Sequence, residues 1–321
     1  MEMTEGLEKG LYDALQVRFV KLHFTVSFLQ DSCLPEDKVS AIRGGMGEML
    51  LRMNCVRDRQ CESCDFRSEC IVQKTMYSKF EKTPKFVTTG GSIGYVLECE
   101  DRREHFGRGE TLDFYLLLFG KTIIYFNQFV QAFQAMGMQS GIGKNHARFQ
   151  IIGIRNTEGQ SILERNALNM KKYIVHVLYD YLLFRKMWRE TNDSRSRMVF
   201  ETPLTLKYRN EFLQEFQLNV IVNAVVRRIY MLDCFEGIES DIYDKYKMEE
   251  TIVPEFLGQE HNLVSVCRYS TRKNGKMILK GIEGYALLPE LPEDIWQILM
   301  VGELIHIGKN TSFGFGRYSI Q

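Results

Sequence analysis

The order of strand-like and helix-like segments, which occurs twice along the chain, constrains the fold more than any other feature of the sequence. In the first half, residues 15–29 are rich in β-branched and aromatic side chains, as strands are. Residues 36–53 instead carry apolar side chains three and four residues apart, which predicts a helix with one buried face. The later elements are expected at 95–99 (strand), 111–119 (strand), 123–136 (helix) and 149–154 (strand). This order, β-α-β-β-α-β, is that of a ferredoxin-like fold.

The second half of the sequence gives the same order, although no residue-level repeat relates the two halves. Strands are expected at 198–207, 263–269, 277–288 and 315–320, and helices at 212–235 and 294–301. We therefore predict an α+β protein of two tandem ferredoxin-like (RRM-like) domains, residues 1–157 and 198–321. A connecting region at 158–197, helical over 173–188, joins them.

Four of the eight cysteines lie close together in an insertion of the first domain, at about residues 54–80. They are Cys55, Cys61, Cys64 and Cys70, so that a central Cys-x-x-Cys is flanked on each side by a cysteine six positions away. The insertion is polar, and a metal would supply the cross-link that a small core cannot. We expect a structural zinc bound by these four thiolates, with an iron–sulfur cluster as the alternative.

A glycine-rich stretch, residues 303–319, combines glycines with bases, an aromatic pair and one histidine. Gly308, Gly314 and Gly316 permit backbone conformations that approach a phosphate closely, and Lys309, Asn310 and Arg317 add hydrogen-bond donors. This composition is typical of a loop that holds a sugar-phosphate backbone. The alternative is a glycine-rich turn between two closing strands.

The formal net charge is zero, with 41 basic and 41 acidic residues, so the average composition lacks the excess of bases of a general nucleic-acid binder. Because charges act within about a Debye length, phosphate binding then requires basic residues that are gathered on one face. Residues 268–273, Lys276 and Lys280 are expected to form such a group. No run of about 18 apolar residues exists, so we expect no membrane contact and a cytoplasmic location.

Several motifs taken together resemble the CRISPR repeat-RNA processing endoribonucleases of the RAMP superfamily. They are Glu201-Thr-Pro-Leu-Thr-Leu-Lys207, Arg227-Arg228, Arg268-Tyr-Ser-Thr-Arg272, Gly281-Ile-Glu-Gly-Tyr285 and His306–Tyr318, with Ile42–Gly45, the four cysteines, Gly109-Glu110 and Gly141-Ile-Gly143 in the first half. The resemblance covers nearly the whole chain.

The resemblance implies two ferredoxin-like domains and an endoribonuclease that cuts precursor CRISPR RNA within its repeats. The 2′-hydroxyl attacks the phosphate to give 2′,3′-cyclic phosphate and 5′-hydroxyl ends, with no metal and no cofactor for catalysis. The implied partners are repeat RNA and subunits of CRISPR effector complexes, not DNA. A non-catalytic RNA-binding subunit of an effector complex is the alternative.

This chemistry needs a base, an acid and a cation at the phosphate. His306, directly before the glycine-rich stretch, is the first candidate for proton transfer, and His23 on the first strand is the second; Lys309 is the candidate cation. A structural role for His306, capping the loop, is the alternative. The residues expected to bind RNA are Arg43, Lys144, His146, Arg268, Arg272, Lys273, Gly308, Asn310, Gly314, Gly316 and Arg317.

Overall fold

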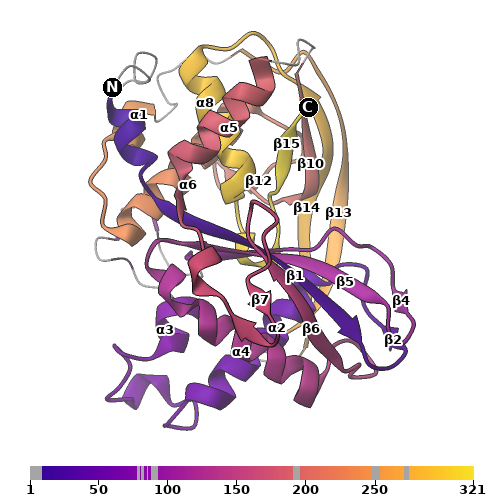
Figure 1. Cartoon of the computed structure of the whole chain (residues 1–321). Helices are drawn as coiled ribbons and strands as arrows, with labels where there is room; N and C mark the ends of the chain where they lie inside the picture. Colours follow the sequence, from indigo (N-terminus) through magenta and orange to yellow (C-terminus); the bar gives the residue numbers. More distant parts are fainter. Residues whose placement is uncertain are drawn as a thin grey trace. The chain divides into compact units, whose positions relative to one another are not determined.

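The computed structural model describes residues 9–77, 80, 83–84, 86–87, 93–190, 196–246, 254–270 and 275–321, and divides into two compact units (Figure 1). The first unit comprises residues 19–175, and the second comprises the residues up to 18 together with 176–321. Each unit is described below by itself. No helix in the described part of the chain combines the length and apolar character needed to cross a bilayer.

The first unit contains a mixed set of strands and helices. They are β1 (Arg18–Phe28), β2 (Ser32–Cys33), α2 (Val39–Asn54), η1 (Cys61–Ser63), α3 (Ile71–Met76), β3 (Tyr95–Glu98), β4 (His105–Phe106), β5 (Thr111–Phe119), η2 (Gly120–Tyr125), α4 (Phe126–Ala135), η3 (Met136–Ser140), β6 (Phe149–Arg155), β7 (Leu163–Glu164), β8 (Ala167–Leu168) and η4 (Met170–Lys172).

The main sheet of this unit has the antiparallel order β3-β5-β1-β6, which is the ferredoxin-like order. Because side chains alternate along a strand, Leu22, Phe24 and Val26 point to one face, where they are buried with residues of α2 and α4. Phe24 stacks on Phe114 of the neighbouring strand, with ring centroids 5.1 Å apart, and meets Phe133 of α4 edge-on at 5.3 Å. The opposite face carries polar side chains such as His23 and Thr25, and also buried apolar ones such as Leu117.

Two glycines on α2 set how closely its neighbours pack. A Cβ atom on Gly45 would lie 2.3 Å from Sδ of Met136, and one on Gly47 would lie 2.8 Å from Cε of Met76. Such distances are well inside van der Waals contact, so only glycine fits without a shift of the neighbour. Packing therefore explains Gly45 and Gly47.

The second unit contains the remaining elements. They are α1 (Lys9–Ala14), β9 (His176–Val177), α5 (Leu178–Glu190), β10 (Arg197–Leu204), β11 (Lys207–Tyr208), β12 (Glu211–Phe212), α6 (Leu218–Glu236), α7 (Ile242–Tyr246), β13 (Gly258–Ser270), β14 (Gly275–Leu287), α8 (Glu293–Ile305), η5 (Thr311–Phe313) and β15 (Tyr318–Ile320).

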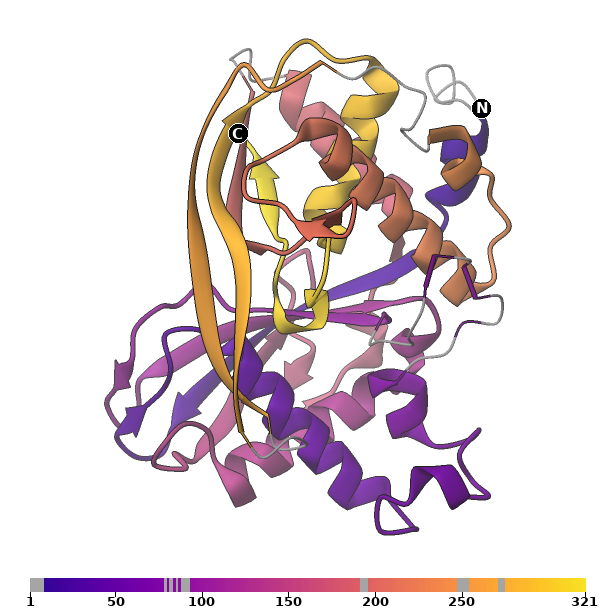
Figure 2. The same ribbon diagram turned by 180° about the vertical axis from the view of Figure 1, so that it is seen from behind.

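The sheet order β13-β14-β10-β15 repeats the topology of the first unit, so the prediction of two tandem ferredoxin-like folds is confirmed. Figure 2 shows β13 and β14 as one long antiparallel ribbon, paired from Gly258 opposite Leu287 to Ser270 opposite Gly275. Helices α6 and α8 pack together beside the sheet. Gly302 of α8 lies so near Tyr318 that a Cβ atom would be 1.9 Å from its hydroxyl oxygen.

Helix α5 is tied to α8 by a buried ion pair. Nε and Nη2 of Arg185 lie 2.6 Å and 2.9 Å from the carboxylate of Glu303, which also accepts a 2.7 Å hydrogen bond from the backbone N–H of Ile320. Burial raises the pKa of Glu303 to about 7, against the opposing effect of Arg185. The helical part of the predicted connecting region thus packs in the second unit.

Several element boundaries predicted from the sequence are wrong, and two of them concern helices of the second unit. The helix expected from residue 212 begins at Leu218, because residues 207–212 form the β11–β12 hairpin instead. Its two turn residues, Arg209 and Asn210, have φ of 48° and 68°, as a two-residue type I′ turn requires. The helix expected to end at 301 continues to Ile305, since its apolar residues extend that far.

We expect the second unit to lose stability as pH rises, through Asp233 of α6. Burial raises the pKa of this carboxyl from 3.8 to about 8; Ser240 Oγ donates to its Oδ2 at 2.5 Å, and Oδ1 has no hydrogen-bond partner in the described structure. Because the folded pKa is the higher one, the contribution is complete below about 3.8 and is lost as pH rises through about 8.

Replacing Asp233→Asn should remove this part of the pH dependence. Urea denaturation followed by tryptophan fluorescence reports the second unit, which holds both tryptophans, Trp188 and Trp296. The wild-type midpoint should fall more steeply between pH 4 and 8 than that of the variant. Parallel curves would contradict the assignment.

Candidate functional site

The glycine-rich loop after α8 is folded tightly against the end of β10. Gly308, Gly314 and Gly316 have φ of 84°, 79° and 72°, and Asn310 has 66°. The backbone N–H of Lys309 donates to the carbonyl of Thr205 at 2.9 Å, and that of Gly316 donates to the carbonyl of Pro203 at 3.0 Å. These left-handed residues let the chain turn repeatedly within a short span, as the glycine pattern predicted.

His306 is fully buried at the start of this loop. Its φ is 55°, and its Nδ1 lies 3.2 Å from the carbonyl oxygen of Phe315 across the loop. An imidazole with no exposed surface has no access to a phosphate in this conformation. The geometry favours the alternative in which His306 caps the loop, and its catalytic role stays a prediction.

A basic and aromatic surface lies on the β11–β12 hairpin and the adjoining loop. Phe212 is 50% exposed, and the ammonium groups of Lys207 and Lys309 lie 4.7 Å and 5.5 Å from its ring centroid. Tyr208 is also exposed, with the guanidinium of Arg209 5.1 Å from its ring. We call Lys207, Tyr208, Arg209, Phe212 and Lys309 the hairpin patch.

Sequence reasoning found only Lys309 of the hairpin patch. The signal was present in Lys-Tyr-Arg-Asn-Glu-Phe (residues 207–212), where bases alternate with aromatics. The segment was assigned partly to a strand and partly to a helix because its turn is Arg-Asn, without the glycine that usually marks a two-residue hairpin.

The other bases predicted to bind RNA in the second unit have different surroundings. The guanidinium of Arg268 lies 4.2 Å from the ring centroid of Phe313, which brings β13 against the loop. Arg317 forms an ion pair with Glu201, Nε to Oε2 at 2.9 Å, so its charge is partly balanced. Arg272 and Lys273 lie outside the described residues.

His23 lies in a polar cluster on the sheet face of the first unit that α2 and α4 leave uncovered. Its Nε2 is 2.9 Å from Oδ1 of Asp113, which also accepts a 2.7 Å hydrogen bond from Thr25. Its ring stacks on Tyr115, with centroids 4.8 Å apart.

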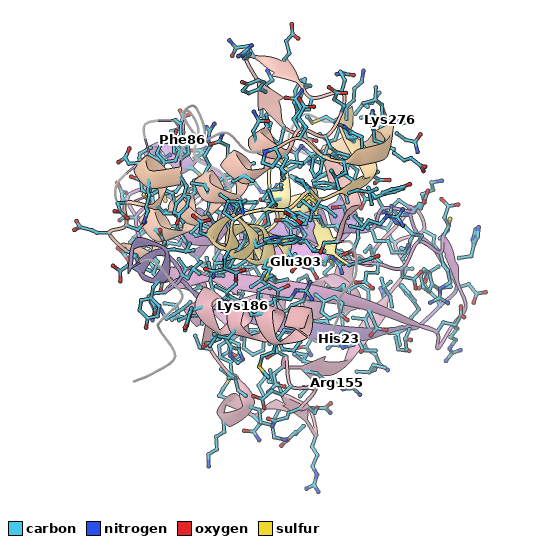
Figure 3. All side chains as sticks on the ribbon, turned by 90° about the horizontal axis from the view of Figure 1, so that it is seen from above. His23, Phe86, Arg155, Lys186, Lys276 and Glu303 are labelled. Carbon is cyan, nitrogen blue, oxygen red and sulfur yellow. The ribbon has the colours of Figure 1, made fainter. Side chains whose placement is uncertain are left out.

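The β-ladder adds a cation to this cluster. His23 pairs with Tyr115 on one side and with Arg155 on the other, so the three side chains project from the same face of neighbouring strands. His23 and Arg155 are labelled in Figure 3. We call His23, Thr25, Asp113, Tyr115 and Arg155 the His23 cluster. The cluster contains an imidazole, a carboxylate hydrogen-bonded to it and, on the neighbouring strand, a guanidinium, which are groups that can transfer a proton or balance charge at a phosphate. The sequence analysis singled out only the histidine.

Three remaining predicted contacts lie elsewhere in the first unit. Lys144 and His146 are exposed in the turn between η3 and β6, where Nδ1 of His146 lies 3.2 Å from the carbonyl oxygen of Ser140. Arg43 is half-buried on α2. The role of these three residues in RNA binding stays a prediction.

Comparison with known proteins relates both halves of the chain to described families. Residues 198–318 match the family model of the CRISPR-associated endoribonuclease Cas6, and residues 15–174 match a model described as an N-terminal domain. No curated protein matches the chain in sequence.

Solved structures share the fold over nearly the whole chain. A partial Cas6-RT-Cas1–Cas2 complex matches with a TM-score of 0.56 and 9% identity, over 95% of this chain but 46% of the larger one. This chain thus spans about half the length of that relative. A product complex of Cas6 from Thermus thermophilus matches with a TM-score of 0.52 and 13% identity, over 94% of this chain and 99% of that one.

We expect Gly316→Ala to unfold the glycine-rich loop. A Cβ atom there would lie 1.8 Å from the carbonyl oxygen of Ile307, in a left-handed conformation that disfavours alanine. The free energy of unfolding should fall by about 3 kcal/mol, measured by tryptophan fluorescence in urea. Gly44→Ala is the control, because a Cβ atom there would meet no atom within 4 Å, and it should leave the midpoint of this transition unchanged. Equal midpoints for the two variants would contradict the packing argument.

Proposed function

We propose that this chain is an endoribonuclease of the Cas6 family, because residues 198–318 match the Cas6 family model. Its fold is that of the RAMP proteins that process CRISPR repeats. The chain cleaves precursor CRISPR RNA once within each repeat, without a metal ion. The match of the second unit to the Cas6 model is the observation that carries this proposal. The 2′-oxygen attacks phosphorus as the bond to the 5′-oxygen breaks, which leaves a 2′,3′-cyclic phosphate and a 5′-hydroxyl.

The His23 cluster is our proposed catalytic centre. Asp113 accepts from Nε2–H of His23 and so keeps Nδ1 as the basic nitrogen, in the way that a carboxylate orients a catalytic imidazole. His23 then removes the proton of the 2′-hydroxyl, and the leaving 5′-oxygen takes a proton from water. Arg155, across the ladder from His23, supplies positive charge to the phosphorane. His306 is retained as the competing assignment.

The hairpin patch is our proposed binding surface for single-stranded repeat RNA. Its bases supply phosphate contacts, and Phe212 and Tyr208 offer ring faces on which unpaired bases stack. Lys309, predicted to stabilise the transition state, is assigned here to the RNA backbone because its ammonium group lies beside Phe212. We also propose that the chain binds other CRISPR proteins, because a structure with a similar fold is part of a complex with Cas1 and Cas2.

We expect His23→Ala to slow cleavage of end-labelled repeat RNA by about 10²–10⁴-fold, the usual worth of a general base, while leaving RNA affinity unchanged. Assays in EDTA, beside RNA with a 2′-deoxy group at the cut position, test the metal-free mechanism. His105→Ala, at an exposed histidine on β4, is the matched control and should cleave normally.

The same assay separates the competing assignments. Normal cleavage by His23→Ala with loss in a folded His306→Ala variant would return the catalytic role to His306. Wild-type protein that binds the repeat tightly but never cuts it would identify a non-catalytic RNA-holding subunit. A requirement for a divalent ion would overturn the proposed chemistry.

We expect Phe212→Ala to weaken binding of single-stranded repeat RNA by about 1–3 kcal/mol, which corresponds to roughly 5–150-fold in Kd. Lys309→Ala should reduce the slope of log affinity against log salt by about one. Phe184→Ala on α5, at another exposed phenylalanine, is the control. Fluorescence anisotropy measures each affinity, and equal losses in the Phe184 and Phe212 variants would remove the hairpin patch from the interface.

A further inference from the structure

The four cysteines expected to bind a structural zinc lie around one cavity of the first unit. Cys55, Cys61, Cys64 and Cys70 are half-buried, form no disulfide, and line a space of about 430 Å³ beside the end of α2. In the part of the chain that the structure describes, no three His, Cys, Asp or Glu side chains are grouped to hold a metal ion. The zinc site and its iron–sulfur alternative therefore stay predictions.

Tyr115 lies against His23 in the cluster proposed as the catalytic centre. The two residues are direct partners in the β1–β5 ladder, so their side chains stand beside each other on one face of the sheet. Their ring centroids are 4.8 Å apart, and the planes of the two rings differ by 21°. This is a stacked arrangement within the range of distances that aromatic pairs prefer. The ring of Tyr115 therefore constrains the plane of the imidazole.

The hydrogen bond to Asp113 constrains the imidazole less. Nε2 of His23 lies 2.9 Å from Oδ1 of Asp113, but the Asp113 side chain is 51% exposed, so water competes for its oxygens. This bond also holds only one atom of the ring, and the torsion that turns an imidazole about its Cβ–Cγ bond has broad minima. A second contact is therefore needed to hold Nδ1, the proposed basic nitrogen, in one direction.

An ion pair on the same sheet face holds the ring of Tyr115 in turn. Glu98 is the partner of Tyr115 on β3, and Lys21 lies two residues before His23 on β1. Nζ of Lys21 is 2.8 Å from Oε2 of Glu98 and 5.0 Å from the centroid of the Tyr115 ring. The Glu98 side chain is only 2% exposed, so solvent ions screen this pair less than they screen an exposed one. Glu98 thus fixes Lys21, and Lys21 contacts Tyr115 as a cation beside an aromatic ring.

We infer that Tyr115 is a positioning residue for His23, whose ring holds the imidazole so that Nδ1 keeps one direction, and that the Lys21–Glu98 ion pair holds that ring. The inference rests on the proposed role of His23 as the general base. It extends that role to a residue that acts through His23. The contact uses the aromatic ring and not the hydroxyl group of Tyr115, so phenylalanine can replace this tyrosine.

Single-turnover cleavage of end-labelled repeat RNA tests the role of the ring. Tyr115→Leu should lower the rate constant of cleavage by about 10- to 100-fold, the usual effect of a misplaced catalytic group, while leaving the Kd for RNA unchanged. Tyr115→Phe should cleave at close to the wild-type rate. The matched control is Tyr179→Leu, at a half-buried tyrosine of the second unit that meets Tyr12 edge-on at 5.0 Å, and it should cleave normally.

Two results of this assay would overturn the inference. One is a wild-type rate for Tyr115→Leu, which would show that the stack does not affect the imidazole. The other is an equal loss of rate in Tyr115→Phe, which would show that the hydroxyl group and not the ring is needed. Circular dichroism verifies that each variant is folded.

A double variant tests whether Tyr115 acts through His23. Adding Tyr115→Leu to His23→Ala should cause no further loss of rate, because no imidazole is left to position. A further loss in the double variant would show that Tyr115 acts independently of His23 and would overturn the inference.

NMR spectra of the histidine rings separate this inference from the proposed function. Long-range ¹H–¹⁵N spectra of protein with labelled histidines, of which the chain has six, show which ring nitrogen carries the proton, and they need no RNA. At a pH where the imidazole is neutral, we expect one Nε2–H form of His23 in the wild type and in Tyr115→Phe. Tyr115→Leu should give both tautomers, because a ring that turns loses the hydrogen bond that selects one of them.

His23→Ala assigns the His23 signal and completes the comparison. Normal cleavage by His23→Ala, together with the expected NMR spectra, would remove the catalytic role of His23 while supporting the positioning of its ring by Tyr115. A single Nε2–H form in Tyr115→Leu would instead overturn the positioning role, whichever residue proves to be the base.

Discussion

The alternation of side chains along the strands is the constraint on which the rest of the structure depends. In the first unit, α2 and α4 cover one sheet face, so every second residue of β1 is apolar and buried. The intervening residues have no helix above them within this unit and are free to be polar. His23 and Thr25 occupy such positions, and their cross-strand partners Asp113, Tyr115 and Arg155 complete a cluster that the ladder holds in register. The packing of the helices on one face thus fixes the strands whose other face carries the His23 cluster.

The fold was predictable from the sequence because its signals are local and repeated. The order of strand and helix patterns identified both ferredoxin-like units, and the sheet orders agree with it. The β11–β12 hairpin was not predicted, because its Arg-Asn turn contains no glycine and because Phe212 fits the helical spacing of the residues after it. Local patterns cannot show that the apolar run belonging to α6 starts only at Leu218.

The candidate site was only partly predictable, for a different reason. The sequence shows that His306 lies directly before the glycine-rich loop, but it does not show in which direction the side chain points. Because α8 continues to Ile305, the loop closes over the imidazole instead of presenting it. The partners of His23 come from strands about 90 and 130 residues later in the chain, so only the sheet register could bring them together. The sequence therefore identifies the side chains that are available, whereas the strand order determines which of them lie side by side.

The cysteine-rich segment enters from α2 and leaves toward β3 at the edge of the main sheet, with no strand of that sheet inside it. The entropy of closing such a loop grows only slowly with its length. A change in the length of this segment therefore costs little free energy and leaves the strand order of the main sheet undisturbed. By contrast, a side chain at Gly45 or Gly47, a few residues earlier on α2, would require Met136 or Met76 to shift.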